Sequence, residues 1–307
     1  MRIVSDFDGV WTEPAREARA VHATVVRELG LVLEEAHERV EARLEEYAAA
    51  VMARPHAYGW LIDHRLASFV DEDFFCLPAA MGQYIENGET ESARQARDAV
   101  LRRWESLTVF MDHCFHSTCA AFREQVDHDL THGAERVLEW LLARGATITW
   151  ATNAPAEKII GWFAHHGHQV ADARETEPGS SPLRVYGRAG KQWFGPTDRS
   201  LDFNGRTVPV DRPQYRAIVE RESPDVVIGD VLSLDLAVPL AMALEGHPAA
   251  PRETVLVARR HTPRWVLDAV GPEPGRIDHV VSHLTSLPRI VLGLTKERAA
   301  LASTAGC

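Results

Sequence analysis

The sequence predicts an α/β protein, in which a doubly wound core around a parallel sheet is interrupted after its first strand by an inserted helical domain. From residue 131 onward, short apolar segments of strand length alternate with amphipathic helical segments. This order is typical of parallel strands joined by crossover helices. Residues 13–130 instead show helical periodicity and little β signal. We therefore assign residues 1–12 and 131–307 to the core, and residues 13–130 to the insert.

The first two core strands are the clearest elements. Residues Arg2–Ser5 form a short apolar run that ends at an acidic turn, and residues Thr147–Ala151 form the next such run. Ahead of the second run, the segment GAERVLEWLLARG places Val137, Leu138 and Leu141 on one face of a helix. A strand that follows another strand through a helix favours parallel pairing.

The remaining core elements continue the alternation, with one irregular region. We predict further helices at residues 157–166, 213–222 and 234–244, and further strands near residues 169–173 and in the segments DVVIG, TVLVA and IDHVV. The Gly-, Pro- and Ser-rich region around residues 177–205 carries the pieces LRVYG and RTVPV, which we interpret as a small β excursion. A doubly wound sheet binds its ligand at the carboxyl ends of its strands.

Composition and charge narrow the classes of function. The net charge of -11 argues against a nucleic-acid or anionic-membrane surface, because both require clustered Lys and Arg. Four cysteines in 307 residues are too few for a disulfide framework. No signal peptide or membrane-spanning apolar run is visible. We therefore expect a reduced cytoplasmic protein, either a monomer or a homodimer, that acts on a small molecule.

Three short segments carry candidate chemistry, and each follows a predicted core strand. Asp6 and Asp8 lie in DFDGVWT, Thr152 and Asn153 follow ITWA, and Asp230 follows DVVIG. If these ends converge, one carboxylate can attack phosphorus while a second protonates the leaving alkoxide and later activates water. Two carboxylates beside a phosphate dianion require a divalent cation, and hard oxygen ligands suit Mg²⁺. The Thr152 hydroxyl and the Asn153 backbone N–H are candidate phosphate-binding donors.

These segments resemble the motifs of the haloacid-dehalogenase-like hydrolase superfamily. Its first motif, Asp-x-Asp-Gly followed by Val or Thr, is similar to residues 6–10; its second, an apolar strand ending in Thr or Ser, is similar to ITWAT; and its fourth is similar to VVIGDVLSLD. The resemblance covers essentially the whole chain, since the order and spacing of the motifs also fit. It implies a Rossmann-like core and a cap domain over the active site at the position of the insert.

The resemblance also implies a role for each matching residue. Asp6 would be the nucleophile and Asp8 the general acid/base. The Mg²⁺ ligands would be the Asp6 side chain, the Asp8 backbone carbonyl and Asp230, with Asp235 in support. Gly9 and Gly229 are the glycines of the first and fourth motifs. A carboxylate at position 8 is typical of the phosphate-transferring members, since the dehalogenases lack it.

The third motif, a Lys or Arg that binds the phosphoryl oxygens, has two candidates. Arg212 precedes Pro213 at the start of a predicted helix, which is where the family commonly places this residue. Lys191 lies farther upstream, in the Gly-rich region, and offers a compact point charge where Arg offers a planar fork. We favour Lys191 because Lys is the family norm, and either side chain can bind phosphate.

Each of these assignments has a structural alternative. An acidic pair after a strand is often only a turn or a cap, and Asp235 could simply cap the following helix. The segment Asp112–Cys119 contains His and Cys, but its spacing matches no standard zinc arrangement, so we interpret it as packing. The sequence thus favours a Mg²⁺-dependent phosphatase for a small phosphorylated metabolite. A phosphotransferase or phosphomutase, or a non-catalytic binding protein on the same scaffold, is the alternative.

Overall fold

The core of the protein is a seven-stranded parallel sheet, as the sequence predicts. The computed structural model describes residues 1–125 and 128–295. The strands are ordered β11-β10-β9-β1-β4-β6-β5, and every neighbouring pair is parallel. Their bounds are β1 Arg2–Ser5, β4 Thr147–Ala151, β5 Ala171–Asp172, β6 Leu183–Tyr186, β9 Val226–Gly229, β10 Glu253–Val257 and β11 His279–Val281. The fold class predicted from the sequence is therefore confirmed.

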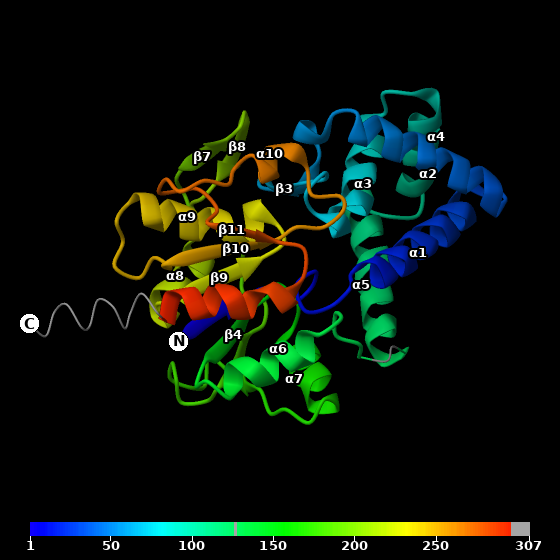
Figure 1. Cartoon of the computed structure of the whole chain (residues 1–307). Coiled ribbons are helices and arrows are strands. Elements are labelled where there is room, and N and C mark those ends of the chain that lie inside the picture. The colour runs from blue at the N-terminus through cyan, green and yellow to red at the C-terminus, as the bar shows by residue number, and fades with distance from the viewer. Residues whose placement is uncertain (126–127, 296–307) are drawn as a thin grey trace, which may run out of the picture.

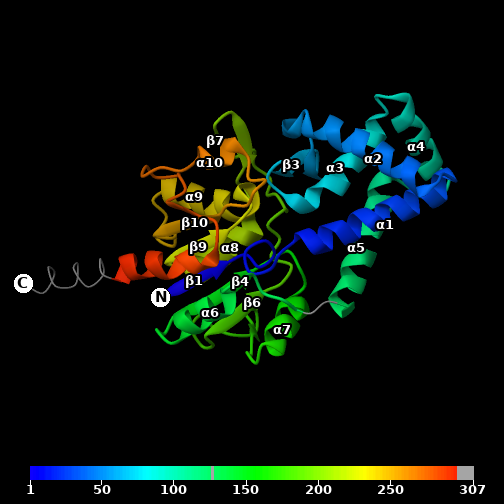
Figure 2. The same cartoon turned by 45° about the vertical axis from the view of Figure 1, so that its right-hand side comes forward.

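Helices cover both faces of this sheet (Figures 1 and 2). Successive residues of a strand point to opposite faces, so Ile3 packs into one hydrophobic cluster and Val4 into the other. The first cluster contains α6 Ala134–Leu142, α7 Ala156–His165 and a helix that begins at residue 287. The second contains α8 Pro213–Glu222, α9 Ala237–Leu244 and α10 Arg264–Leu267. A short π-helix, Leu232–Leu236, leads into α9.

The insert has a hydrophobic core of its own and lies to one side of the sheet (Figure 1). Its helices are α1 Ala15–Leu33, α2 His37–Met52, α3 Leu77–Asn87, α4 Glu91–Leu101 and α5 Leu107–Gln125. Short 3-10 turns occur at Pro55–Ala57 and Phe74–Cys76 in the insert, and at Leu284–Ser286 in the core. Val25, Leu29, Leu44 and Tyr47 are fully buried where these helices meet.

The insert also contains a β-hairpin that the sequence did not predict. Strands β2 Gly59–Ile62 and β3 Arg65–Phe69 pair antiparallel. Asp63 and His64 join them and both adopt positive φ, at 47° and 64°. Two-residue hairpin loops require positive φ and normally use Asn-Gly or Asp-Gly. The pair Asp-His carries a much weaker turn signal, so the hairpin could not be recognised from its turn.

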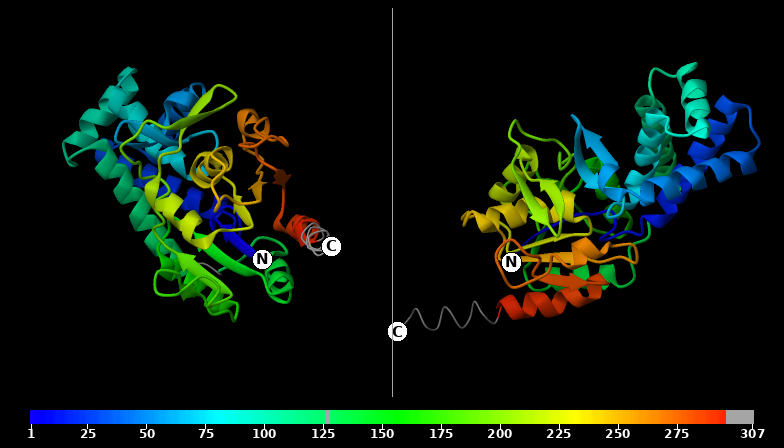
Figure 3. Two further views of the ribbon diagram at one scale, coloured as in Figure 1. Left: turned by 90° about the vertical axis from the view of Figure 1, so that its left-hand side faces the viewer. Right: turned by 90° about the horizontal axis from the view of Figure 1, so that it is seen from above.

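This hairpin and the residues that directly follow it contact the core. In Figure 3 it lies between the insert helices and a second hairpin, β7 Ser200–Phe203 with β8 Arg206–Pro209. Phe69 packs edge-on against Trp265 with ring centroids 5.5 Å apart. The Arg206 guanidinium lies 3.2 Å from the carboxylate of Asp71. The Glu72 carboxylate accepts the Ser233 backbone N–H at 3.1 Å.

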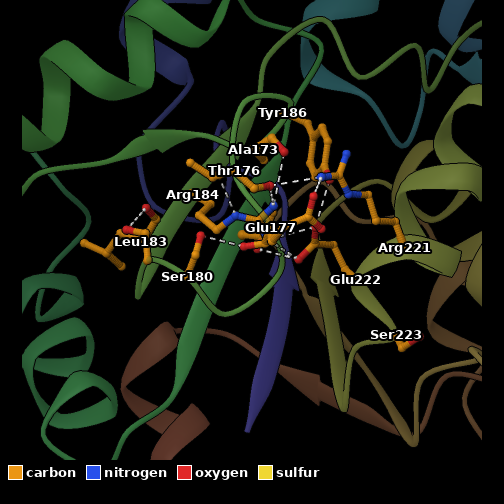
Figure 4. A network of polar contacts seen from close by, with 12 residues as sticks. Ala173, Thr176, Glu177, Ser180, Leu183, Arg184, Tyr186, Arg221, Glu222 and Ser223 are labelled. Atoms are coloured by element: carbon orange, nitrogen blue, oxygen red, sulfur yellow. Dashed lines mark hydrogen bonds and ion pairs between the residues drawn. The ribbon is translucent and has the colours of Figure 1, made fainter.

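The piece LRVYG belongs to the main sheet and not to a small excursion, which corrects the prediction for that region. Its four strand residues, Leu183–Tyr186, are all buried, as in other parallel strands covered on both faces. Arg184 hid this pattern because a charged residue rarely lies in such a strand. Figure 4 shows how the charge is accommodated: the Arg184 guanidinium donates to both carboxylate oxygens of Glu222, at 2.7 and 3.0 Å. Only the piece RTVP lies in a separate hairpin.

Within residues 1–125 and 128–295, no helix has both the length and the apolar character that crossing a bilayer requires.

Candidate functional site

The carboxyl ends of four core strands open into one cavity of about 500 Å³ that the insert covers. Each of these strands is followed by a segment that contributes predicted site residues to the lining. These residues are Asp6, Asp8, Thr152, Asn153, Lys191, Asp230 and Asp235. Residues that are far apart in the sequence thus meet at one edge of the sheet, as a doubly wound fold requires.

Asp6 lies at the centre of this group, beside Lys191. The Lys191 ammonium is 2.6 Å from Oδ1 of Asp6 and 2.8 Å from Oδ1 of Asp235. Burial raises the pKa of Asp6 to about 7, against the opposing effect of Lys191. Burial alone would lower the pKa of Lys191, but Asp235 and Asp6 outweigh it and raise that pKa. Lys191 is therefore a fixed cation next to the candidate nucleophile.

Asp235 holds both the lysine and the turn that carries Asp230. Its Oδ2 accepts the backbone N–H groups of Asp230 and Val231 at 3.1 and 3.0 Å. At Gly229, an added Cβ would lie 2.2 Å from the Asp235 Cβ, so only glycine permits this approach. Asp235 therefore supports the site by position.

The carboxylates of Asp6, Asp230 and Asp235 fit a divalent cation. Each offers one oxygen, and these oxygens lie within 4.8 Å of one another. Oδ1 of Asp230 is buried and has no hydrogen-bond partner among the described residues. Burial, together with the nearby Asp235 and Asp6, raises the pKa of Asp230 well above its usual range. A hard cation would favour the ionised form of this carboxyl group and would take the unpaired oxygen as a ligand.

Gly9 allows the first and fourth motifs to touch. It adopts φ +78°, and a Cβ there would lie 1.9 Å from Oδ2 of Asp230. Arg259 from the loop after β10 donates to the Gly9 carbonyl and so holds this turn in place.

Asp8 has a partner that the motifs do not reveal. The ammonium of Lys158, on α7, lies 2.8 Å from Oδ1 of Asp8 and 3.2 Å from Oε2 of Glu17 on α1. Thr12 also donates to Asp8 Oδ1, at 3.3 Å. Asp8 and Glu17 outweigh burial and raise the pKa of Lys158. In the sequence, helical spacing could have pointed to Lys158, because it lies four residues before the buried Trp162 and therefore on the inward face of the helix.

The second-motif segment fixes the backbone around the lysine. Thr152 is only 2% exposed, and its Oγ1 accepts the Ala154 N–H at 3.1 Å. Oδ1 of Asn153 accepts the Lys191 N–H at 3.0 Å. Thr152 and Asn153 directly follow β4 and both line the cavity.

Arg212, the other third-motif candidate, does not line the cavity. Its guanidinium is fully buried and donates to the carbonyls of Pro209 at 3.1 Å, of Ala67 at 2.6 Å and of Lys191. Burial lowers its pKa to about 10. With its donors committed to carbonyls, Arg212 positions the Lys191 segment and the insert hairpin, whereas Lys191 itself lines the cavity.

The His- and Cys-containing segment belongs to α5, where Cys114 is buried among hydrophobic residues of the insert. Cys119 is also buried and reaches the cavity wall. Among the residues that the structure describes, the side chains grouped closely enough to hold a metal ion are the three aspartates and not this segment.

No family model matches the sequence, and no curated protein matches it. Solved structures with a similar chain include a HAD phosphatase from Thermococcus onnurineus, with 13% identity, 94% of this chain and 97% of that chain covered, and a TM-score of 0.43. CbbY from Rhodobacter sphaeroides, in complex with phosphate, has 13% identity, coverage of 93% and 95%, and a TM-score of 0.41. A 2-haloacid dehalogenase from Pseudomonas syringae pv. Tomato DC3000 has 13% identity, coverage of 95% and 98%, and a TM-score of 0.40. At this identity and TM-score, the likeness carries no family, activity or substrate over to this chain.

Proposed function

We propose that this chain is a Mg²⁺-dependent phosphohydrolase of the haloacid-dehalogenase-like type, acting on a small phosphomonoester through a phosphoaspartate on Asp6. The observation that supports it is the pairing of Asp6 with Lys191 at the floor of a covered cavity, with Asp8 and Asp230 lining the same floor. A buried carboxylate with a fixed cation beside it is suited to attack an anionic phosphoryl group, because the cation offsets the repulsion.

The reaction has two steps. In the first, a carboxylate oxygen of Asp6 forms a bond to phosphorus while the bond to the leaving alkoxide breaks, and Asp8 gives that alkoxide its proton. In the second, Asp8 takes a proton from water, whose oxygen attacks phosphorus and releases Asp6 and inorganic phosphate. Lys191, which donates to Asp6, would contact the phosphoryl oxygens in both steps.

Asp6 and Asp230, with Asp235 behind them, are the side chains that would hold Mg²⁺. When bound, the ion supplies positive charge that offsets the carboxylates and the phosphate. If the insert excludes bulk water from the cavity when substrate is bound, each of these electrostatic interactions becomes stronger.

The test is phosphate release from Asp6→Asn and Asp8→Asn, each measured with Mg²⁺ beside the unaltered protein. Asp6→Asn is expected to abolish turnover, with an unchanged circular dichroism spectrum. Asp8→Asn is expected to slow turnover by about 10²- to 10⁴-fold, the usual contribution of a general acid/base. Appreciable Mg²⁺-dependent turnover by Asp6→Asn would remove Asp6 from the nucleophile's role.

A further inference from the structure

The part of the cavity that faces the leaving group is built from the insert. Resting on the function proposed above, we propose that the alcohol part of the substrate is a bulky apolar group, of the size of an aromatic ring, that carries no second anionic group. The argument comes from the walls, the charges and the volume of this part of the cavity.

The walls contributed by the insert are mainly aromatic and aliphatic. The apolar side chains among them are Trp60, Leu61, Ile62, Phe75, Leu107, Met111 and Phe115. Phe115 is edge-on to both Trp60 and Phe75, with ring centroids 5.7 and 6.2 Å apart. Edge-to-face packing keeps these rings in place, so the wall is a formed surface for a ring or another apolar body.

The cations in the cavity are all engaged at its floor. Among the described residues that line it, the Lys and Arg side chains are Lys158 and Lys191, and each is held by two carboxylates. The other ionisable insert side chains in the lining include the acidic Asp73, Glu86 and Asp112, together with His116. A second phosphate or a carboxylate on the leaving group would lose its hydration there, meet negative charge and find no Lys or Arg free to pair with it.

The volume fits a substrate of this class. About 500 Å³ lies within the range of sites that enclose a drug-sized molecule, and it is far more than a phosphate group needs. A two-carbon alcohol would leave most of the apolar wall in contact with water. A ring-sized alcohol would bury it, and burial of apolar surface is favourable by about 25 cal/mol per Å².

The test compares three esters that share one chemistry: 4-methylbenzyl phosphate, 4-carboxybenzyl phosphate and ethyl phosphate. The first two are close in size and differ in charge, whereas the third lacks the ring. We expect kcat/KM for 4-methylbenzyl phosphate to exceed that of each of the other two at least tenfold. Equal or better turnover of the carboxylated ester or of ethyl phosphate would overturn the inference.

A charge placed in the wall makes the test specific to this surface. Thr108 and Val109 are neighbours on α5 and both are exposed, but only Thr108 lines the cavity. Thr108→Lys should raise kcat/KM for the carboxylated ester at least tenfold relative to the methylated one. Val109→Lys, the matched control, should leave that ratio unchanged. A ratio that moves equally in both variants, or in neither, would count against the proposed surface.

Acetyl phosphate separates this inference from the proposed function, because its small, activated acyl group makes no use of the apolar wall. Hydrolysis of acetyl phosphate without the expected preference among the three esters overturns the leaving-group inference alone. If no phosphate is released from any of the four compounds in the presence of Mg²⁺, the phosphohydrolase proposal is overturned, and the leaving-group inference with it.

Discussion

The ammonium of Lys158 lies 2.8 Å from Oδ1 of Asp8, so the candidate acid/base is held by a lysine on α7. The same ammonium is 3.2 Å from Glu17 at the start of the insert. We expect Lys158→Met to lower kcat for an alkyl phosphate about 10- to 100-fold, because a misplaced Asp8 protonates the leaving alkoxide poorly. The loss should be smaller for p-nitrophenyl phosphate, whose leaving group needs no proton. Steady-state kinetics on both esters measure this difference.

The control for Lys158 is Arg16→Met, which removes the same charge from an exposed ion pair with Asp129. It should leave both rates unchanged. Equal losses on the two esters in Lys158→Met would show that the lysine supports folding or binding and not proton transfer.

A second prediction concerns Gly9, which has no side chain and therefore lets the Asp230 carboxylate lie against its Cα. Gly9→Ala places a Cβ against that carboxylate and is expected to abolish activity as well as to lower stability. Gly145→Ala is the matched control, since Gly145 also has positive φ, at +69°, but a Cβ added there would meet no atom within 4 Å. It should cost only the strain of about 1–2 kcal/mol and retain activity. Urea unfolding and phosphate release separate the two effects.

Magnesium should stabilise the protein through Asp230. Because a ligand that binds only the folded state adds about 2.7 kcal/mol at 100 times its Kd, Mg²⁺ should raise Tm measurably. Asp230→Asn removes a charged ligand and should lose most of this rise, and a chelator should reverse the rise in the unaltered protein. An equal rise in both proteins would place the ion elsewhere.

Glu72, where the insert meets the core, predicts a pH dependence of stability. Burial raises its pKa from 4.5 to about 8, against the opposing hydrogen bonds. The folded state therefore binds more protons than the unfolded state between these values, and stability from this group is full below pH 4.5 and is lost as pH rises toward 8. Glu72→Gln removes the titrating carboxyl group and with it this pH-dependent contribution. The free energy of unfolding of the variant should therefore fall less steeply between about pH 5 and 8 than that of the unaltered protein. Parallel curves for both proteins would contradict the prediction.

The buried pair of Arg184 and Glu222 makes a prediction for stability alone (Figure 4). Arg184→Met leaves the Glu222 carboxylate buried beside only the hydroxyls of Tyr186 and Thr149, and it should cost about 3–5 kcal/mol in urea unfolding. Arg184→Met with Glu222→Leu should recover much of this loss, because no charge then remains buried. A single variant within about 1 kcal/mol of the unaltered protein would contradict this account.

Much of the core could be predicted from the sequence because local signals and tertiary structure agree there. The runs at residues 2–5 and 147–151 are apolar, end at polar turns and form strands β1 and β4. Their positions, together with Asp230 after β9, place the aspartates at one edge of the sheet before any coordinates are known. The glycines of the first and fourth motifs follow from the same close approach.

What could not be predicted depends on contacts between distant segments. Lys158 looks like an ordinary helix lysine until α7 packs against the first motif and α1. Lys191 and Arg212 are both buried, but only Lys191 lines the cavity, whereas the arginine donates to the carbonyl of Ala67, 145 residues away in sequence. The hairpin of the insert has a turn, Asp63-His64, whose backbone conformation its residues only weakly favour.

The shared guanidinium of Arg212 has a consequence for how this chain can be recombined. It hydrogen-bonds at once to Ala67 in the insert and to the Lys191 backbone in the core, so the two parts are not interchangeable modules. In a chimera that joins residues 13–130 to a different core, the Ala67 carbonyl of the transplanted hairpin would lose its hydrogen bond to Arg212. The recipient core would have to supply an arginine at the same place.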